Sequence, residues 1–210
     1  INQVAIAAVQ IVMNNTLRHY GALSAYGSDI PIACAGIISK VNQVFMAICI
    51  GISQGSQPIW GFNYGAEKYS RVRQTYRYSV TLCTVIATIF FICFQFFPHQ
   101  IVGIFGNGSD LYFHFAEKYL RIFMLMTFAN GIQPMSACFF TSIGKARLGV
   151  IMSLTRQVLF LLPLIVIFPV FFGIDGVMYA GPIADTSAFV LAVVFARREL
   201  GVMKAAEQNA

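Results

Sequence analysis

Charged side chains that interrupt apolar stretches are the first candidates for chemistry in this sequence. They are Lys40, Arg121, Arg156 and Asp185. A charge at the centre of a bilayer costs about 2.5–3.5 kcal/mol or more unless it is paired or reaches water, so such residues mark pathways or ion pairs. Arg121 lies near the end of its stretch, where its side chain can reach the interface. Lys40, Arg156 and Asp185 lie deeper, and they are candidate residues of a substrate or ion pathway.

Asp185 is the acid that lies well inside an apolar stretch. It could form a structural ion pair or take part in transport, and the sequence favours neither role. In a helical hairpin centred on Asp175, Arg156 lies nineteen residues before the centre and Asp185 ten after it. At about 1.5 Å per residue the two differ in depth by roughly 14 Å. Lys40 lies eleven residues after Asp29, at a depth similar to that of Asp185. We therefore predict Lys40, rather than Arg156, as the partner of Asp185.

Amide side chains are frequent in the same stretches. An interhelical hydrogen bond of this kind is worth about 0.6 kcal/mol on average, so part of the set only joins helices. Their concentration beside so few charges predicts a water-filled, weakly charged cavity. Pro58 and Pro134, each near glycine and glutamine, predict breaks in two helices, and broken helices beside a cavity are typical of transporters. The candidate pathway amides are Asn14, Gln43, Gln54, Gln57, Asn130, Gln133 and Gln157.

The composition indicates that helices in a bilayer position these side chains. Of the 210 residues, 58% are hydrophobic and 10% are charged, whereas a soluble domain has about 25% charged residues. A spanning helix needs about 20 apolar residues. The predicted fold class is an all-α membrane protein with six transmembrane helices, the first of them short: residues 4–17, 30–60, 78–97, 119–142, 150–172 and 177–196.

The basic residues between these spans alternate in a way that sets the orientation. Cytoplasmic loops are rich in Lys and Arg. The opposite loops hold two bases, Arg18 and Lys118. We therefore predict an inner-membrane protein with a cytoplasmic C-terminus, and we read the basic loops as topological anchors rather than as a nucleic-acid site. Nine bases lie in the loops after the second and fourth spans and in the tail: Lys68, Arg71, Arg73, Arg77, Lys145, Arg147, Arg197, Arg198 and Lys204.

Enzymatic and metal-dependent functions find no support in the sequence. His19, His99 and His114 have no ligand spacing, and there is no nucleophile elbow, phosphate-binding loop or dinucleotide fingerprint. The cysteines lie inside apolar stretches without a C-x-x-C spacing, as buried hydrophobic residues do. We expect no catalytic residues, no metal site and no disulfide framework. The five cysteines are Cys34, Cys49, Cys83, Cys93 and Cys138.

The segment GISQGSQPIWGFNYGAEKYSRVR, which starts at Gly51, is similar to the end of the eighth helix in the multidrug and toxic compound extrusion (MATE) family. Further segments resemble later helices of that family in the same order: YLRIFML with GIQP, LTRQVLFLLPLIVIFP, and FGIDGVMYAGPIAD. The likeness extends over essentially the whole chain. The positions that match the family pattern of the first segment are Gly51, Gln54, Gly55, Gln57, Pro58, Gly61, Asn63, Tyr64, Gly65 and Ala66.

The resemblance implies two six-helix lobes around a central cleft and the export of amphipathic or cationic compounds in exchange for protons or sodium, without another cofactor. In that frame residues 1–200 are the C-terminal lobe, with helices corresponding to the seventh to twelfth and the first one truncated, and residues 201–210 are a cytoplasmic tail. The expected partners are small-molecule drugs, membrane lipid and an N-terminal lobe that this chain lacks. The motif at Gly51 would close the eighth helix at the cytoplasmic face.

The acidic residues place the chain within the family and leave other functions open. The NorM-like branch has acids in its seventh and tenth helices, whereas residues 4–17 and 119–142 contain none. The chain therefore resembles the DinF-like branch, and the family transfers no ion site to it. A lipid-linked oligosaccharide flippase of related architecture would need a strongly basic cavity. A non-transporting assembly subunit would bury its amides in dry helix contacts.

Overall fold

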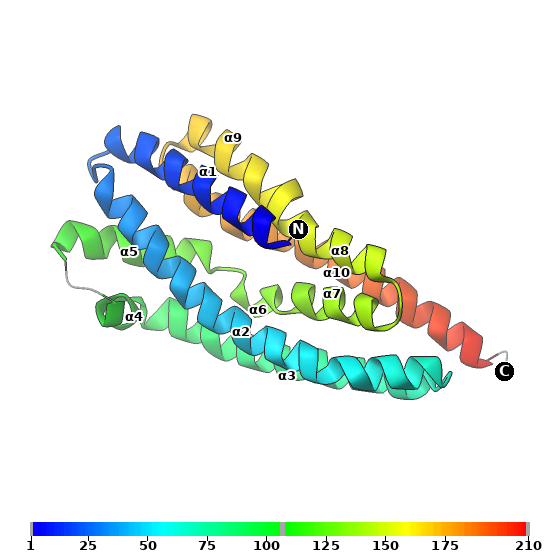
Figure 1. Ribbon diagram of the computed structural model, residues 1–210. Coiled ribbons are helices and arrows are strands. Elements are labelled where there is room, and N and C mark those ends of the chain that lie inside the picture. The colour runs from blue at the N-terminus through cyan, green and yellow to red at the C-terminus, as the bar shows by residue number, and fades with distance from the viewer. Residues whose placement is uncertain (1, 106–107, 209–210) are drawn as a thin grey trace.

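Helices account for nearly all of the molecule. The computed structural model describes residues 2–105 and 108–208, which form a bundle of six long rods (Figure 1). Each predicted span falls on one rod, so the all-α membrane fold is confirmed. Four rods are single helices: α1 (Asn2–Ala22), α2 (Asp29–Gly65), α3 (Tyr69–Phe96) and α10 (Asp175–Gln208).

Hydropathy distinguishes α1 from the other rods. Among the described residues, four helices are long and apolar enough to cross a membrane, and the bent rod formed by residues 110–142 makes a fifth span. Rod α1 has the length but not the hydropathy, because amides such as Gln3, Gln10 and Asn14 interrupt its apolar residues. The first span therefore stays a prediction, and its amides are explained by the cavity described below.

The fourth rod is interrupted at two places, and the glycine and proline beside Gln133 predict only the second of them. It consists of α5 (Asp110–Phe123), α6 (Thr127–Asn130) and α7 (Ile132–Ser142). The bend of 46° lies between Phe123 and Thr127, and a shorter interruption at Gly131 separates α6 from α7. A methyl group at Gly131 would lie 2.6 Å from Sγ of Cys83 on α3. The backbone at Gly131 therefore packs so closely against α3 that no larger residue fits there.

The second rod is not broken, and the expected helix break at Pro58 is wrong. Helix α2 continues past Pro58 to Gly65. Trp60 is fully buried, and its ring lies edge-on to Phe139 at 5.5 Å. This packing holds the last two turns in place. The chain reverses only at Glu67, which has a φ of 56°.

The fifth rod changes its helical type in the middle. It runs from α8 (Ala146–Leu154) through the π-helix η1 (Thr155–Leu161) into α9 (Leu162–Phe172). Pro163, at the start of α9, has no N–H for the preceding turn. A π segment accommodates such a lost bond by widening the helix, and π segments are frequent at functional sites.

The turns divide between the two ends of the bundle. The α2–α3 turn, the α7–α8 turn and the C-terminus share one end, and the α1–α2 and α9–α10 connections share the other (Figure 1). All nine predicted anchor bases therefore belong to one end. The short helix α4 (Pro98–Phe105) lies at the opposite end, and the sequence did not predict it. Residues 201–208, the larger part of the expected cytoplasmic tail, continue α10 as helix.

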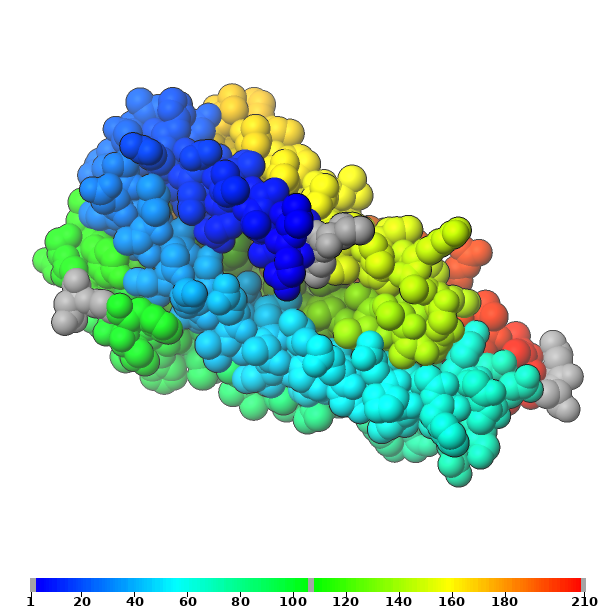
Figure 2. All heavy atoms as spheres, viewed as in Figure 1, coloured from blue at the N-terminus to red at the C-terminus, as the bar shows by residue number. Residues whose placement is uncertain are grey.

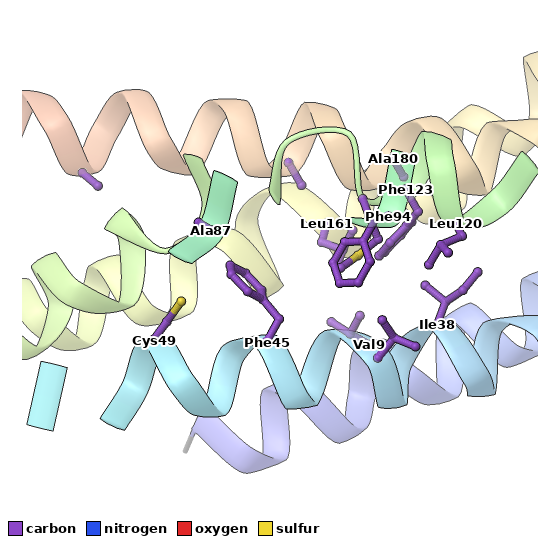
Figure 3. Close-up of a cluster of buried hydrophobic side chains, with 14 of the residues drawn as sticks. Val9, Ile38, Phe45, Cys49, Ala87, Phe94, Leu120, Phe123, Leu161 and Ala180 are labelled. Atoms are coloured by element: carbon purple, nitrogen blue, oxygen red, sulfur yellow. The ribbon is translucent and has the colours of Figure 1, made fainter. Parts of the chain in front are cut away.

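Apolar side chains fill the space between the rods. Figure 3 shows Val9 of α1 and Ile38 of α2 directed toward Leu120 and Phe123 of α5, with Leu161 of η1 nearby. This layer keeps α1 and α2 at a fixed distance from the fifth rod. Three residues of this layer, Val9, Phe123 and Leu161, also line the cavity described below.

Candidate functional site

A cavity lies between α1, α2, α7 and the junction of α8 with η1. It has a volume of about 450 Å³ and is partly open to the surface. Figure 2 shows the surface hollowed between α1, α2 and the α7–α8 hairpin. The broken fourth rod and the π segment both border it, so the two irregular rods shape the same site.

Polar and apolar residues line the cavity in equal number. A wall of this kind suits a molecule with an apolar body and a few polar groups. The nine apolar residues are Ile6, Val9, Met13, Met46, Ala47, Ile50, Phe123, Pro134 and Leu161. The nine polar residues are Gln3, Gln10, Ser39, Asn42, Gln43, Gln133, Ser153, Arg156 and Gln157.

Four of the ten predicted site residues line this cavity: Gln43, Gln133, Arg156 and Gln157. Asn14 lies next to it, because its Oδ1 accepts a hydrogen bond of 3.1 Å from Nε2 of the lining residue Gln10. The structure thus brings together half of the predicted set from α1, α2, α7 and η1.

The remaining predicted residues lie outside the wall. Lys40 and Gln54 are exposed on α2 and Gln57 is half-buried. Asn130 and Asp185 are buried at 4% exposure each, and they lie behind Arg156.

An ion pair joins η1 to α10 beneath the cavity. Nε of Arg156 donates to Oδ1 of Asp185 over 2.5 Å, and both side chains are at most 5% exposed. Nδ2 of Asn130 donates to Oδ2 of Asp185 over 3.1 Å. Both carboxylate oxygens are therefore held by protein donors, and the Arg156 side chain is fixed where it reaches the cavity.

The expected pairing of Asp185 with Lys40 is wrong, because the hairpin was centred at the wrong residue. Gly176 packs directly on the backbone of Phe168, and a methyl group at Gly176 would lie 2.5 Å from the Phe168 carbonyl carbon. The two rods therefore overlap from Gly176 onward, and residue 159 lies opposite Asp185. Arg156 is three residues from that level, about 4.5 Å, which its side chain spans easily.

Gln133 ties the two irregular rods together. Its Nε2 donates to the carbonyl oxygen of Met152 over 2.7 Å, one turn before the π segment begins. Carbonyl groups near such a change of helical register need new donors. Thr155 accompanies this change by donating its hydroxyl to the carbonyl of Ile151 over 2.6 Å. Gln133 therefore both lines the cavity and stabilises the backbone that presents Arg156 and Gln157.

Sequence reasoning missed five polar lining residues. Gln10 and Asn42 belong to the same amide-rich stretches. Gln10 lies seven residues after Gln3, on the same helix face, and this spacing could have revealed both; Asn42 directly precedes the predicted residue Gln43. Oδ1 of Asn42 is buried without a hydrogen-bond partner among the described residues. Ser39 and Ser153 carried no signal, because serine is common in membrane helices for packing reasons.

The sequence matches the MatE family model over residues 3–167. It is 26% identical over 186 residues to the multidrug export protein MepA of Staphylococcus saprophyticus, an alignment that covers 87% of this chain and 40% of the relative. The chain thus spans about 40% of the length of this curated relative.

Solved structures agree on the fold. An outward-facing multidrug resistance MATE family transporter superimposes with a TM-score of 0.86 at 15% identity, over 97% of this chain and 45% of that one. An inward-facing structure also gives a TM-score of 0.86 at 15% identity, over 97% of this chain and 46% of that one.

Proposed function

This chain belongs to the MatE family of multidrug efflux transporters, whose members are transporters and not enzymes, and we propose that it forms the C-terminal, cavity-bearing lobe of one. One observation carries the proposal: the cavity wall combines amides and one arginine with apolar side chains. The wall is built for amphipathic molecules rather than for one rigid substrate.

A second lobe completes the site. Gly36, Lys40, Gln43 and Gln54 are exposed along one side of α2, beside the cavity. A lysine exposed at the depth of the hydrocarbon is costly against lipid but not against water. This stripe therefore faces an aqueous cleft between this lobe and an N-terminal lobe contributed by the rest of the protein.

The lobe moves as a unit between the two faces of the membrane. It superimposes equally well on the outward-facing and the inward-facing relatives, with a TM-score of 0.86 for each. Such agreement is expected when alternating access comes from rocking whole lobes against each other.

The membrane orientation follows from the charges. The end that carries the nine bases faces the cytoplasm of the inner membrane, by the positive-inside rule. Apolar side chains such as Phe62, Ile104 and Phe171, each at least 75% exposed, face lipid. Export is coupled to protons or sodium, and the chain fits the DinF-like branch because residues 4–17 and 119–142 contain no acid.

A cavity-filling substitution tests the function. We expect Ala47→Trp in the full-length protein to reduce export of an amphipathic fluorescent dye from loaded cells, because Ala47 lines the cavity. The matched control is Ala33→Trp, which also replaces an exposed alanine of α2 but lies outside the wall. Equal export by both variants, at equal amounts of protein in the membrane, would contradict the assignment of the cavity as the binding site.

A further inference from the structure

Deep in the lobe, the surface that borders the cavity carries basic side chains and, among the described residues, no free acidic one. Asp185 is the acid that lies far inside a rod, and Arg156 neutralises it. Lys40 is exposed on α2, next to the lining residues Ser39 and Gln43. The surface that borders the cavity therefore offers positive charge and amide groups, and the buried carboxylate is not presented to it.

Both oxygens of the Asp185 carboxylate already accept hydrogen bonds from the protein. One oxygen accepts from Nε of Arg156 over 2.5 Å and the other from Nδ2 of Asn130 over 3.1 Å. A substrate cation could reach it only by displacing one of these donors. The ion pair is thus a support for Arg156 and not a receptor for a positively charged group.

Arg156, in contrast, retains donors for a ligand. A guanidinium carries five N–H groups, and the bond to Asp185 uses the one at Nε. Arg156 also lines the cavity. Since Nε is taken by the carboxylate behind, the four N–H groups of the Nη end are the ones left for a ligand, and a guanidinium fork of this kind binds carboxylates through two parallel bonds.

We infer that this cavity recognises amphipathic molecules through a carboxylate or an equivalent strong acceptor that docks on Arg156, with Lys40 adding positive potential at the entrance. The inference rests on the proposed function and names its substrate class: anionic or zwitterionic amphipaths. The apolar body lies between Met46 and Ile50 of α2 and Phe123 and Leu161 on the opposite wall.

A matched pair of dyes tests this inference. The probes are a zwitterionic rhodamine with a free benzoate and its methyl ester, which has nearly the same shape but no carboxylate. Binding to the purified full-length protein in lipid nanodiscs is measured by fluorescence anisotropy. We expect the wild type to bind the benzoate about tenfold or more tightly than the ester, the range for one hydrogen bond to a charged group.

Two variants separate the docking role from folding. Arg156→Gln with Asp185→Asn removes both charges and keeps an amide pair beneath the cavity, so no buried charge is left alone. Arg156→Lys keeps the charge, but its single nitrogen faces Asp185. Both should abolish the preference for the benzoate while leaving ester binding within about twofold. The matched control, Lys145→Gln with Glu199→Gln, removes an ion pair of similar length, 2.6 Å, far from the cavity and should keep the preference.

The outcomes are distinct. Loss of the preference in both Arg156 variants, with the control unchanged, supports the inference. A wild type that binds ester and benzoate equally, or variants that keep the preference, overturns it while the proposed function stands. A wild type that binds neither dye overturns the proposed function as well.

Discussion

Removing one partner of the Arg156–Asp185 pair should destabilise the lobe much more than removing both. The Nε–Oδ1 distance of 2.5 Å places the charge centres about 4 Å apart, where the attraction is about 4 kcal/mol at an effective dielectric of about 20. Asp185→Asn leaves the guanidinium buried without its counter-charge, a loss of about 3–5 kcal/mol in comparable pairs. For a lobe of this size that corresponds to a fall in Tm of roughly 6–20 °C.

A double-mutant cycle on the full-length protein in detergent measures this coupling. Thermal unfolding is followed for Asp185→Asn, Arg156→Gln and the double variant, and the double variant should recover most of the loss, since no lone charge remains. Lys40→Gln is the control, because Lys40 is exposed and should change stability by no more than about 0.5 kcal/mol. Additive losses in the cycle, or coupling of Asp185 to Lys40 instead, would refute the pairing.

Two further predictions concern the broken rod and the topology. Gly131→Ala should destabilise the protein by about 1–3 kcal/mol, because the new methyl group would lie 2.6 Å from Sγ of Cys83. The control Gly51→Ala, whose methyl group would meet nothing within 4 Å, should be neutral or stabilising. Thermal unfolding of both variants measures the difference. Cysteines introduced at Lys68 and Gly108 should label from the cytoplasmic and the outer side respectively with a membrane-impermeant maleimide, and labelling of both from the same side would contradict the orientation.

Apolar periodicity and loop charge sufficed to predict the rods, because both follow directly from the thickness and polarity of the bilayer. The short interruption at Gly131 was also predictable, since Gly131 and Pro134 weaken the same turn, but the larger bend between Phe123 and Thr127 was not predicted. Pro58 has similar neighbours, yet α2 continues, because Trp60 packs on Phe139 from another rod. Local sequence carries no information about such a contact, and tertiary packing outweighed the local preference.

The candidate site was predictable in kind but not in arrangement. Amides in apolar stretches indicated a cavity, and Gln43, Gln133 and Gln157 line it. The pairing of Asp185 depended on where two rods start to overlap, which the contact of Gly176 with Phe168 determines. Moving the centre of the hairpin from residue 175 to residue 172 moves the position opposite Asp185 by six residues, from 165 to 159. That shift exchanged Arg156 for Lys40, so depth arguments in helical hairpins depend on the geometry of the turn.

The length of α10 gives the molecule two kinds of ion pair with different sensitivity to salt. With 34 residues the helix is about 51 Å long, well beyond the roughly 30 Å of the hydrocarbon core. Its last turns place Glu207 beside Arg73 and Glu199 beside Lys145, and the side chains of Glu207 and Lys145 are 39% and 38% exposed. At such exposed groups ions screen charges over about 8 Å at physiological ionic strength. Arg156 and Asp185 are shielded from that electrolyte. Raising the ionic strength will therefore loosen the basic end of the lobe while the pair beneath the cavity keeps its strength.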